Sequence, residues 1–434
     1  MKQKLTATPR ASAQALGVAA LMFAAASCQA QMTAPSTATA SDSVASEPNP
    51  YYLGARAAFT HDTNVNRAPG GQSDNYWTTS VFGGFDQPIG RQRVFGRANV
   101  GYSKYNEQTQ LDNTSYDISG GLEWSAAQRL SGSVNVSFNQ YLSAPATFST
   151  IPDLRRNVAN TESIDAVVRY GGASLLTLEG RIGYSQVDYS LPEYQSDEAE
   201  NTYGSVGLYY NPGGPLRLGI AVRYTTTDSP ESAPGVTPAV VANTSDGENL
   251  DFTANYEVSG QVSAGGRLSY TRQTNSGITA ADFSGWTGAL YLSYRPTGKL
   301  LFNAYAARDA GFSTESGWVQ QTFLVGSTPI TRTFTEVFQV AEVISSVGLG
   351  VTYAATAKIS AIAGVRYGRT TLVNQAGGET LDTSTVGYLG ASYDVARNWL
   401  LGCNLSLENR DVSGGVNYTY DANSFGCFAQ YTWR

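Results

Sequence analysis

The stretch RVFGRANVGY, residues 93–102, decides the fold of this chain. Its even positions are apolar or small and end on Tyr102, whereas Arg93 and Arg97 occupy odd positions. Side chains of a β-strand point alternately to opposite faces of a sheet, so the stretch predicts a strand with one apolar face and one polar face. Val94 opens the apolar set and lies eight positions before the aromatic residue that closes it.

The same spacing of eight recurs along the chain, from an apolar residue just after a short turn to an aromatic residue. Strands of one direction carry the pairs Val94/Tyr102, Leu130/Phe138, Leu176/Tyr184, Leu216/Tyr224, Val262/Tyr270 and Ile359/Tyr367. Strands of the other direction carry Trp77/Phe85, Tyr116/Trp124 and Trp286/Tyr294. Eight steps of ~3.4 Å, tilted by roughly 40°, rise about 21 Å, close to the height of the apolar band of an outer-membrane barrel. The pattern therefore predicts strands that cross a membrane.

From Tyr51 onward the sequence divides into eighteen alternating segments, joined by connections that are tight and long in turn. The tight ones carry turn residues such as Gly171-Gly172 and Pro296-Thr297-Gly298. We therefore predict an all-β fold, a transmembrane antiparallel up-and-down barrel of 18 strands with short periplasmic turns and long extracellular loops. The alternative is a soluble β-sandwich or propeller, in which the apolar face would turn inward.

Two sets of tyrosines are predicted to mark the membrane interfaces. The outer set is Tyr102, Tyr184, Tyr224, Tyr270 and Tyr367. The inner set is Tyr170, Tyr210, Tyr256, Tyr294 and Tyr353. One connection, which contains Val319, Phe323, Phe334 and Val337 around Gly326-Ser327-Thr328-Pro329, is predicted to be a strand extension that protrudes as a hairpin.

The start of the chain has the organisation of a secretory signal, a positively charged stretch followed by a short apolar core from Ala15 to Ala26. No later run approaches the ~20 apolar residues that a transmembrane helix needs. Because Ala25-Ala26-Ser27-Cys28 also resembles a bacterial lipobox, acylation of Cys28 is the alternative fate of this segment. The predicted organisation is a signal peptide at 1–30, a flexible periplasmic leader at 31–50 and the outer-membrane barrel at 51–434.

Two cysteines remain after the signal, Cys403 and Cys427. Alternation places both on the apolar face, Cys403 together with Leu401 and Leu405. An antiparallel hairpin centred near Gly415 sets the two cysteines directly opposite, within reach of a cross-strand bond. Because the compartment beyond the inner membrane is oxidising, we predict a Cys403–Cys427 disulfide, and two small lipid-facing thiols are the alternative.

The sequence carries little chemistry for catalysis. His61 is the one histidine, and we find no nucleophile elbow, zinc spacing or phosphate-binding loop. The run Asp62 to Asn66 resembles the opening of a calcium loop, but Arg67 stands where the turn glycine should be. We therefore expect no enzyme activity, metal or cofactor. The formal net charge of −7 argues against nucleic acid as a partner.

The polar face of the predicted strands would line the lumen. Its basic members are Arg56, Arg93, Arg97, Arg169, Arg181, Arg217, Arg223, Arg267, Arg295, Lys358 and Arg366. Its glutamates are Glu123, Glu179, Glu257 and Glu408, and its aromatic residues are Phe95, Tyr291 and Tyr305. A wall of mixed charge is typical of a porin, in which it keeps the lumen hydrated. Aromatic faces together with forked guanidinium donors also suit sugar rings and uronate carboxylates.

Two stretches of the chain resemble the β-barrel porin 2 family. The first is Phe59-Thr60-His61-Asp62-Thr63-Asn64-Val65-Asn66-Arg67. The second is Gly426-Cys427-Phe428-Ala429-Gln430-Tyr431-Thr432-Trp433-Arg434, which departs from the usual terminal aromatic residue by ending on arginine. The likeness covers most of residues 51–434.

This resemblance implies an outer-membrane barrel of the kind that accompanies exopolysaccharide secretion machinery. We therefore expect an outer-membrane porin that forms the exit channel for a secreted exopolysaccharide. Its expected partners are outer-membrane lipid and lipopolysaccharide, the polysaccharide chain, and a periplasmic polysaccharide export protein. The alternative function is an uptake porin for small solutes such as oligosaccharides or organic acids.

Overall fold

The computed structural model describes residues 50–433 apart from 127–128, 144–154, 173, 232–241, 259, 277–281, 326–327, 375–378 and 415–417. For residues 193, 196, 312–341 and 374 it describes only the backbone. The predicted signal peptide and nearly all of the predicted leader therefore lie outside the described residues.

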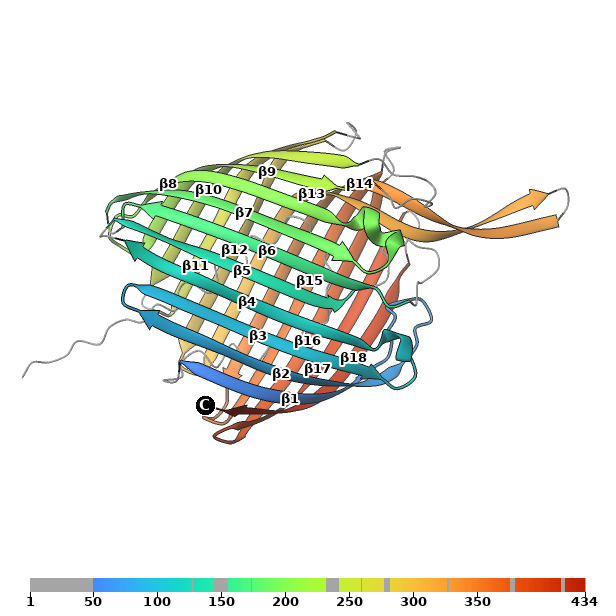
Figure 1. Cartoon of the computed structure of the whole chain (residues 1–434), viewed down its shortest axis with the longest axis horizontal. Helices are drawn as coiled ribbons and strands as arrows, with labels where there is room; N and C mark the ends of the chain where they lie inside the picture. Colours follow the sequence, from blue (N-terminus) through green and yellow to red (C-terminus); the bar gives the residue numbers. More distant parts are fainter. Residues whose placement is uncertain are drawn as a thin grey trace, which may run out of the picture.

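The described chain forms one closed antiparallel sheet of 18 strands (Figure 1). The strands are β1 (Tyr51–Asp62), β2 (Asp74–Ile89), β3 (Gln92–Tyr105), β4 (Asn113–Ala126), β5 (Leu130–Leu142), β6 (Val158–Tyr170), β7 (Leu176–Tyr189), β8 (Ala199–Tyr210), β9 (Leu216–Ser229), β10 (Asn243–Val258), β11 (Val262–Asn275), β12 (Phe283–Thr297), β13 (Leu300–Val325), β14 (Thr328–Ala354), β15 (Ile359–Asn374), β16 (Glu379–Ala396), β17 (Trp399–Ser413) and β18 (Tyr420–Trp433). Two short 3-10 turns, η3 (Thr109–Leu111) and η4 (Pro192–Asp197), interrupt the loops. Each strand pairs with its neighbour in the chain, and β1 pairs with β18 to close the ring. The predicted strand number and topology are confirmed.

The two faces of the sheet have opposite chemistry. Apolar side chains on the outside are left uncovered, as at Ile182 and Val222, where 66% and 65% of the surface is exposed. Polar side chains on the inside are buried, as at Asp251 and Ser269. A soluble protein would bury the apolar set, so this inversion excludes the sandwich and propeller alternatives and identifies a barrel that lies in the outer membrane.

All ten tyrosines of the predicted girdles belong to the outward face. Nine of them are exposed: Tyr102, Tyr170, Tyr210, Tyr224, Tyr256, Tyr270, Tyr294, Tyr353 and Tyr367. Tyr184 is half-buried, and its hydroxyl donates a hydrogen bond to Gln186. Tyrosine is favoured at membrane interfaces because its ring is apolar and its hydroxyl is polar.

The longest strands, β13 and β14, extend beyond the rim of the barrel (Figure 1). Pairing of β13 with β12 ends at Arg308, and pairing of β14 with β15 ends at Val340. Beyond these residues the two strands pair only with each other, as far as Val325 and Thr328. The predicted protruding hairpin is therefore confirmed for the backbone, while the side chains singled out within it lie outside the described residues.

Candidate pore wall and extracellular mouth

The register of the sheet assigns the predicted lining residues to the inward face. In the pairing of neighbouring strands Arg93 lies opposite Glu123, and Arg169 lies opposite Glu179. Tyr291 and Tyr305 likewise lie opposite each other. By the same alternation the inward face carries Arg56, Phe95, Arg97, Arg181, Arg217, Arg223, Glu257, Arg267, Arg295, Arg366 and Glu408.

Lys358 is the exception and corrects the predicted wall. It lies in the turn between β14 and β15, where its backbone N–H donates to Thr356 Oγ1 at 3.2 Å, and its side chain is exposed. Counting alternate positions places a residue on a face only while the backbone remains extended, and the strand begins one residue later, at Ile359. Lys358 therefore belongs to the periplasmic rim.

Most wall arginines are paired with carboxylates. Arg93 contacts Asp86 at 2.6 Å and Glu123 at 3.3 Å. Glu179 lies at the centre of a second cluster, 2.7 Å from Arg169, 3.3 Å from Arg217 and 3.9 Å from Arg181. Arg93 is thus matched by two acids, whereas three arginines share the single carboxylate of Glu179.

A third cluster lies on β9 to β13. Arg223 Nε donates to Asp251 at 2.9 Å, and Ser269 Oγ donates to the same carboxylate at 2.6 Å. Two strands further on, Arg267 donates to Asp309 at 3.2 Å. These side chains join β9, β10, β11 and β13 across the inner surface, and in this cluster two arginines balance two aspartates.

Aromatic rings support several of the guanidinium groups. Arg56 lies over the ring of Phe428 at 3.8 Å, and Arg217 lies over Tyr209 at 4.3 Å. Arg366 lies over Tyr388 at 5.8 Å, and Arg93 over the predicted Phe95 at 5.1 Å. Sequence reasoning had not selected Phe428, Tyr209 or Tyr388, although strand alternation already placed them on the polar face.

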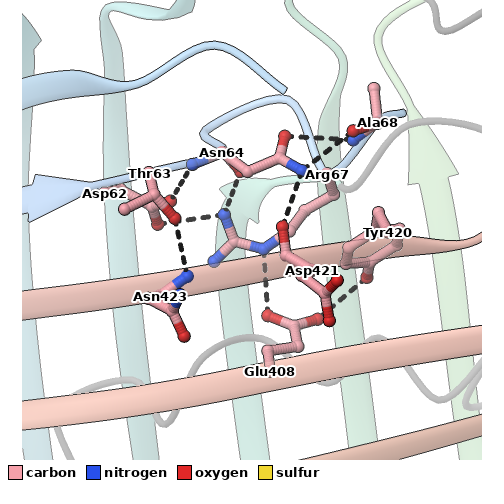
Figure 2. A network of polar contacts seen from close by, with 9 residues as sticks. All are labelled: Asp62, Thr63, Asn64, Arg67, Ala68, Glu408, Tyr420, Asp421 and Asn423. Carbon is pink, nitrogen blue, oxygen red and sulfur yellow. Dashed lines mark hydrogen bonds and ion pairs between the residues drawn. The ribbon is translucent and has the colours of Figure 1, made fainter. Parts of the chain in front are cut away.

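The loop after β1 folds over the inner wall and is held there by Arg67 (Figure 2). Arg67 donates from Nη1 to Asp62 and from Nε to Glu408, each at 2.9 Å, and Tyr420 donates its hydroxyl to the other Glu408 oxygen at 2.8 Å. Burial lowers the pKa of Arg67, but the charges of Asp62 and Glu408 outweigh it and raise this pKa above its ordinary value. The guanidinium therefore remains charged and bound to both acids.

Asn64 completes this clamp from the same loop. Its side-chain nitrogen donates to the carbonyl oxygens of Ala68 and Asp421, both at 2.9 Å (Figure 2). The backbone N–H of Thr63 donates to Asn423, and the backbone N–H of Asn423 donates to Thr63 Oγ1. In the run that resembles a calcium loop, Asp62 is thus paired with the guanidinium of Arg67. The contacts of this run bind β1 to β17 and β18.

On another side of the mouth, η4 lies against β13, although β13 is not a neighbour of β7 or β8 in the sheet. The ring of Tyr194 in η4 lies 6.0 Å from that of Tyr189, and Tyr194 is buried. Glu198 follows this turn and accepts the Tyr189 N–H at 3.2 Å. The loop between β7 and β8 therefore spans part of the opening, and together with the Arg67 clamp it narrows the extracellular mouth.

The cysteines lie on the outside of the barrel. Cys403 and Cys427 are directly opposite in the pairing of β17 with β18, and the structure joins them by a disulfide. Cys403 is exposed and shares its face with Leu401 and Leu405. The bond is therefore a covalent link between the last two strands that faces lipid.

No family model matches the chain, and no curated protein matches it. Among solved structures, it is similar to OpdK of Pseudomonas aeruginosa with vanillate, at 13% identity over 88% of this chain and 99% of that chain, with a TM-score of 0.45. It is also similar to OccK2 (OpdF) of the same organism, at 13% identity over 88% of this chain and 97% of that chain, with a TM-score of 0.44. The ferric enterobactin receptor PfeA, again of P. aeruginosa, is 9% identical over 89% of this chain and 82% of that chain, with a TM-score of 0.42. At these values the similarities assign neither a family nor a ligand.

Within the described part of the chain, no group of three or more His, Cys, Asp or Glu side chains could hold a metal ion. No helix among the described residues is long and apolar enough to cross a membrane.

Proposed function

We propose that this protein is a passive channel through which small polar solutes cross the outer membrane. The observation that carries the proposal is the inner wall, which is lined by charged side chains that are mostly paired with one another, as at Arg223 and Asp251. Such a wall tolerates water and polar solutes and holds no strong net charge of one sign. An 18-stranded barrel leaves an aqueous lumen when no separate domain fills it.

The extracellular mouth favours small solutes over a polymer. The loop that carries η4 reaches across the opening to β13, and the loop held by Arg67 lies against the inner wall, where two buried carboxylates fix Arg67. A polysaccharide in transit would have to displace these loops, and breaking a buried ion pair costs several kcal/mol, about 3–5. A small solute needs only the space between them.

Exit of exopolysaccharide, which the resemblance to β-barrel porin 2 proteins implies, is the second candidate. The aromatic rings on the inner face favour it, because Tyr209 and Phe95 are sites at which a sugar ring could stack beside an arginine. Under this function, lipopolysaccharide would surround the outer rim, and a periplasmic polysaccharide export protein would dock at the short turns.

Reconstitution of the purified barrel separates the two functions. As a solute channel, it should give ohmic conductance in planar bilayers and should swell liposomes in monosaccharide or disaccharide, but not in a long dextran. A deletion strain should then keep its surface polysaccharide and lose permeability to a small solute. Polymer trapped in the periplasm of that strain, with normal solute permeability, would instead support export.

A further inference from the structure

The outer face of β13 departs from the tyrosine girdle at one position. The ninth residue of β11 is Tyr270 and that of β15 is Tyr367, and both are exposed at the outer interface. The ninth residue of β13 is Arg308. Alternation from Phe302, which is exposed on the outside, assigns Arg308 to the same face, and its side chain is exposed. A cation therefore stands where the neighbouring strands of the same direction carry an aromatic ring.

A second outward arginine lies in the same row of the sheet. Arg308 on β13 is paired with Ser345 on β14, and Ser345 is paired in turn with Arg369 on β15. Arg369 lies two residues beyond Tyr367 and is also exposed. Because neighbouring strands are about 4.8 Å apart, the two arginine backbones are ~10 Å apart, with one serine between them. The three side chains therefore project from one small area of the outer surface.

These two arginines have no anionic neighbour on the outer surface. Neither Arg308 nor Arg369 makes an ion pair, a hydrogen bond or a ring contact with any described residue. Along the row the nearest carboxylate is that of Asp411 on β17, two strands from Arg369. The outward positions above and below the row on the same three strands are uncharged: Ala306, Ala310, Val343, Val347, Tyr367 and Thr371. The row is thus a small positive patch in an apolar surface.

We propose that Arg308, Ser345 and Arg369 form a binding site on the outside of the barrel for a phosphate of lipid A. The row lies at the height of the outer girdle, where the hydrocarbon of the outer leaflet meets its headgroups, and lipid A carries its phosphates there. Two unpaired cations so close together repel each other, and an anion between them removes this repulsion. Guanidinium groups bind phosphate through forked N–H donors, and the serine hydroxyl between them adds a further donor. The inference concerns the outer surface and is independent of what crosses the lumen.

Native mass spectrometry of the detergent-solubilised barrel, titrated with bisphosphorylated lipid A, tests this site. The double variant Arg308→Gln/Arg369→Gln should raise the apparent Kd about tenfold, which corresponds to about 1.4 kcal/mol. Arg308→Lys/Arg369→Lys keeps both charges but lacks the planar forks, so it should lose part of the affinity.

The matched control is Lys104→Gln/Arg272→Gln. It also removes two exposed cations of the outer surface, each two residues beyond a girdle tyrosine, but from β3 and β11, which are not neighbours in the sheet. Because these two cations cannot share one phosphate, the control should leave the Kd for lipid A unchanged. Single-channel conductance should be unchanged in both double variants, since all four positions lie outside the lumen.

An unchanged Kd in the Arg308→Gln/Arg369→Gln variant, with its folding verified by gel electrophoresis, would overturn the proposal and leave two interfacial arginines that extend to water. An equal rise of the Kd in the control would overturn it as well, because the effect would then follow net charge. Lipid A without phosphates should bind the wild-type barrel less tightly, and equal binding would refute the assignment to a phosphate. Inorganic phosphate at the same concentration should not displace lipid A, and displacement would assign the site to the free anion.

Discussion

Arg67 Nε donates to Glu408 at 2.9 Å, so the loop after the first strand is bound to the penultimate strand. The contact passes over β18, which lies between β1 and β17 in the sheet. A barrel closes where its first and last strands meet, and here the backbone pairing runs from Leu53–Trp433 to Asp62–Ser424. The side-chain contact adds a second link across this seam at its extracellular end.

Replacement of Arg67 by Gln should destabilise the barrel. It would leave Asp62 and Glu408 as buried anions without a cation, and removing one partner of a buried ion pair costs about 3–5 kcal/mol. Denaturant unfolding in detergent, followed by the shift of the folded band in gel electrophoresis, measures the loss. Glu408→Gln is the control, because its amide oxygen still accepts from Arg67 or Tyr420, and it should cost less. Equal losses in the two variants would contradict the argument.

The disulfide should contribute to stability and leave conductance unaffected. The two cysteines are 24 positions apart, and closing a loop of that length stabilises by about 3.5 kcal/mol in the chain-entropy treatment. The double variant Cys403→Ser/Cys427→Ser should therefore unfold at lower denaturant and conduct normally, since both positions face lipid. Mass spectrometry of unreduced wild-type protein is the direct check, and two free thiols would refute the bond.

Adjacent residues on β6 test the assignment of faces. Ile164 is exposed on the outside, whereas Ser163 is on the inside and hydrogen-bonds to Ser137 at 2.7 Å. Ile164→Arg should cost about 2–4 kcal/mol, because it places a charge near the bilayer midplane. Ser163→Arg places the same charge in water and should change the free energy of unfolding little. If Ser163→Arg lowered the free energy of unfolding more than Ile164→Arg, the assignment of the inward and outward faces would be wrong.

The loop that carries η4 should be more stable in acid. Burial and the charge of Asp188 raise the pKa of Glu198, while the hydrogen bond from Tyr189 lowers it less. A raised folded pKa means that the loop favours the protonated carboxyl. Its stability is therefore fully present below the ordinary glutamate pKa of about 4.3 and is lost as pH rises through the higher folded value.

Amide exchange at Tyr194, corrected for the intrinsic effect of pH, should show this loss of protection between pH 4 and 7. Glu198→Gln is the matched variant, because its amide still accepts the Tyr189 N–H but cannot ionise. Protection in Glu198→Gln should stay constant over the same range. A pH response that persists in the variant would assign the effect to another group.

Most of the fold follows from the sequence. Each strand must put apolar side chains toward lipid and polar ones toward water, so a period of two runs through every membrane-crossing segment. The tight turns then set the order and direction of the strands, and they place Cys403 opposite Cys427 without any long-range information. The same alternation places Phe428 and Tyr388 on the polar face, but it does not show that either ring lies beneath an arginine.

The ion pairs of the wall required the tertiary structure. Alternation shows that Arg56 and Arg93 face the same lumen, but it does not show that one is unpaired and the other lies between Asp86 and Glu123. Which side chains meet across neighbouring strands depends on the stagger of the sheet. The sequence of a single strand does not determine that stagger.

Among the contacts of the barrel, the Arg67 clamp at the extracellular mouth depends most strongly on the tertiary structure. Arg67 and Glu408 are 341 positions apart, and nothing local to either residue selects the other. They meet only because the last strand returns to pair with the first. Alternation and turn chemistry act over a few residues and therefore determine strands, faces and the last hairpin from sequence alone. Closure of the ring is a property of all 18 strands together, and it decided which charges meet across the seam and which remain open to the lumen.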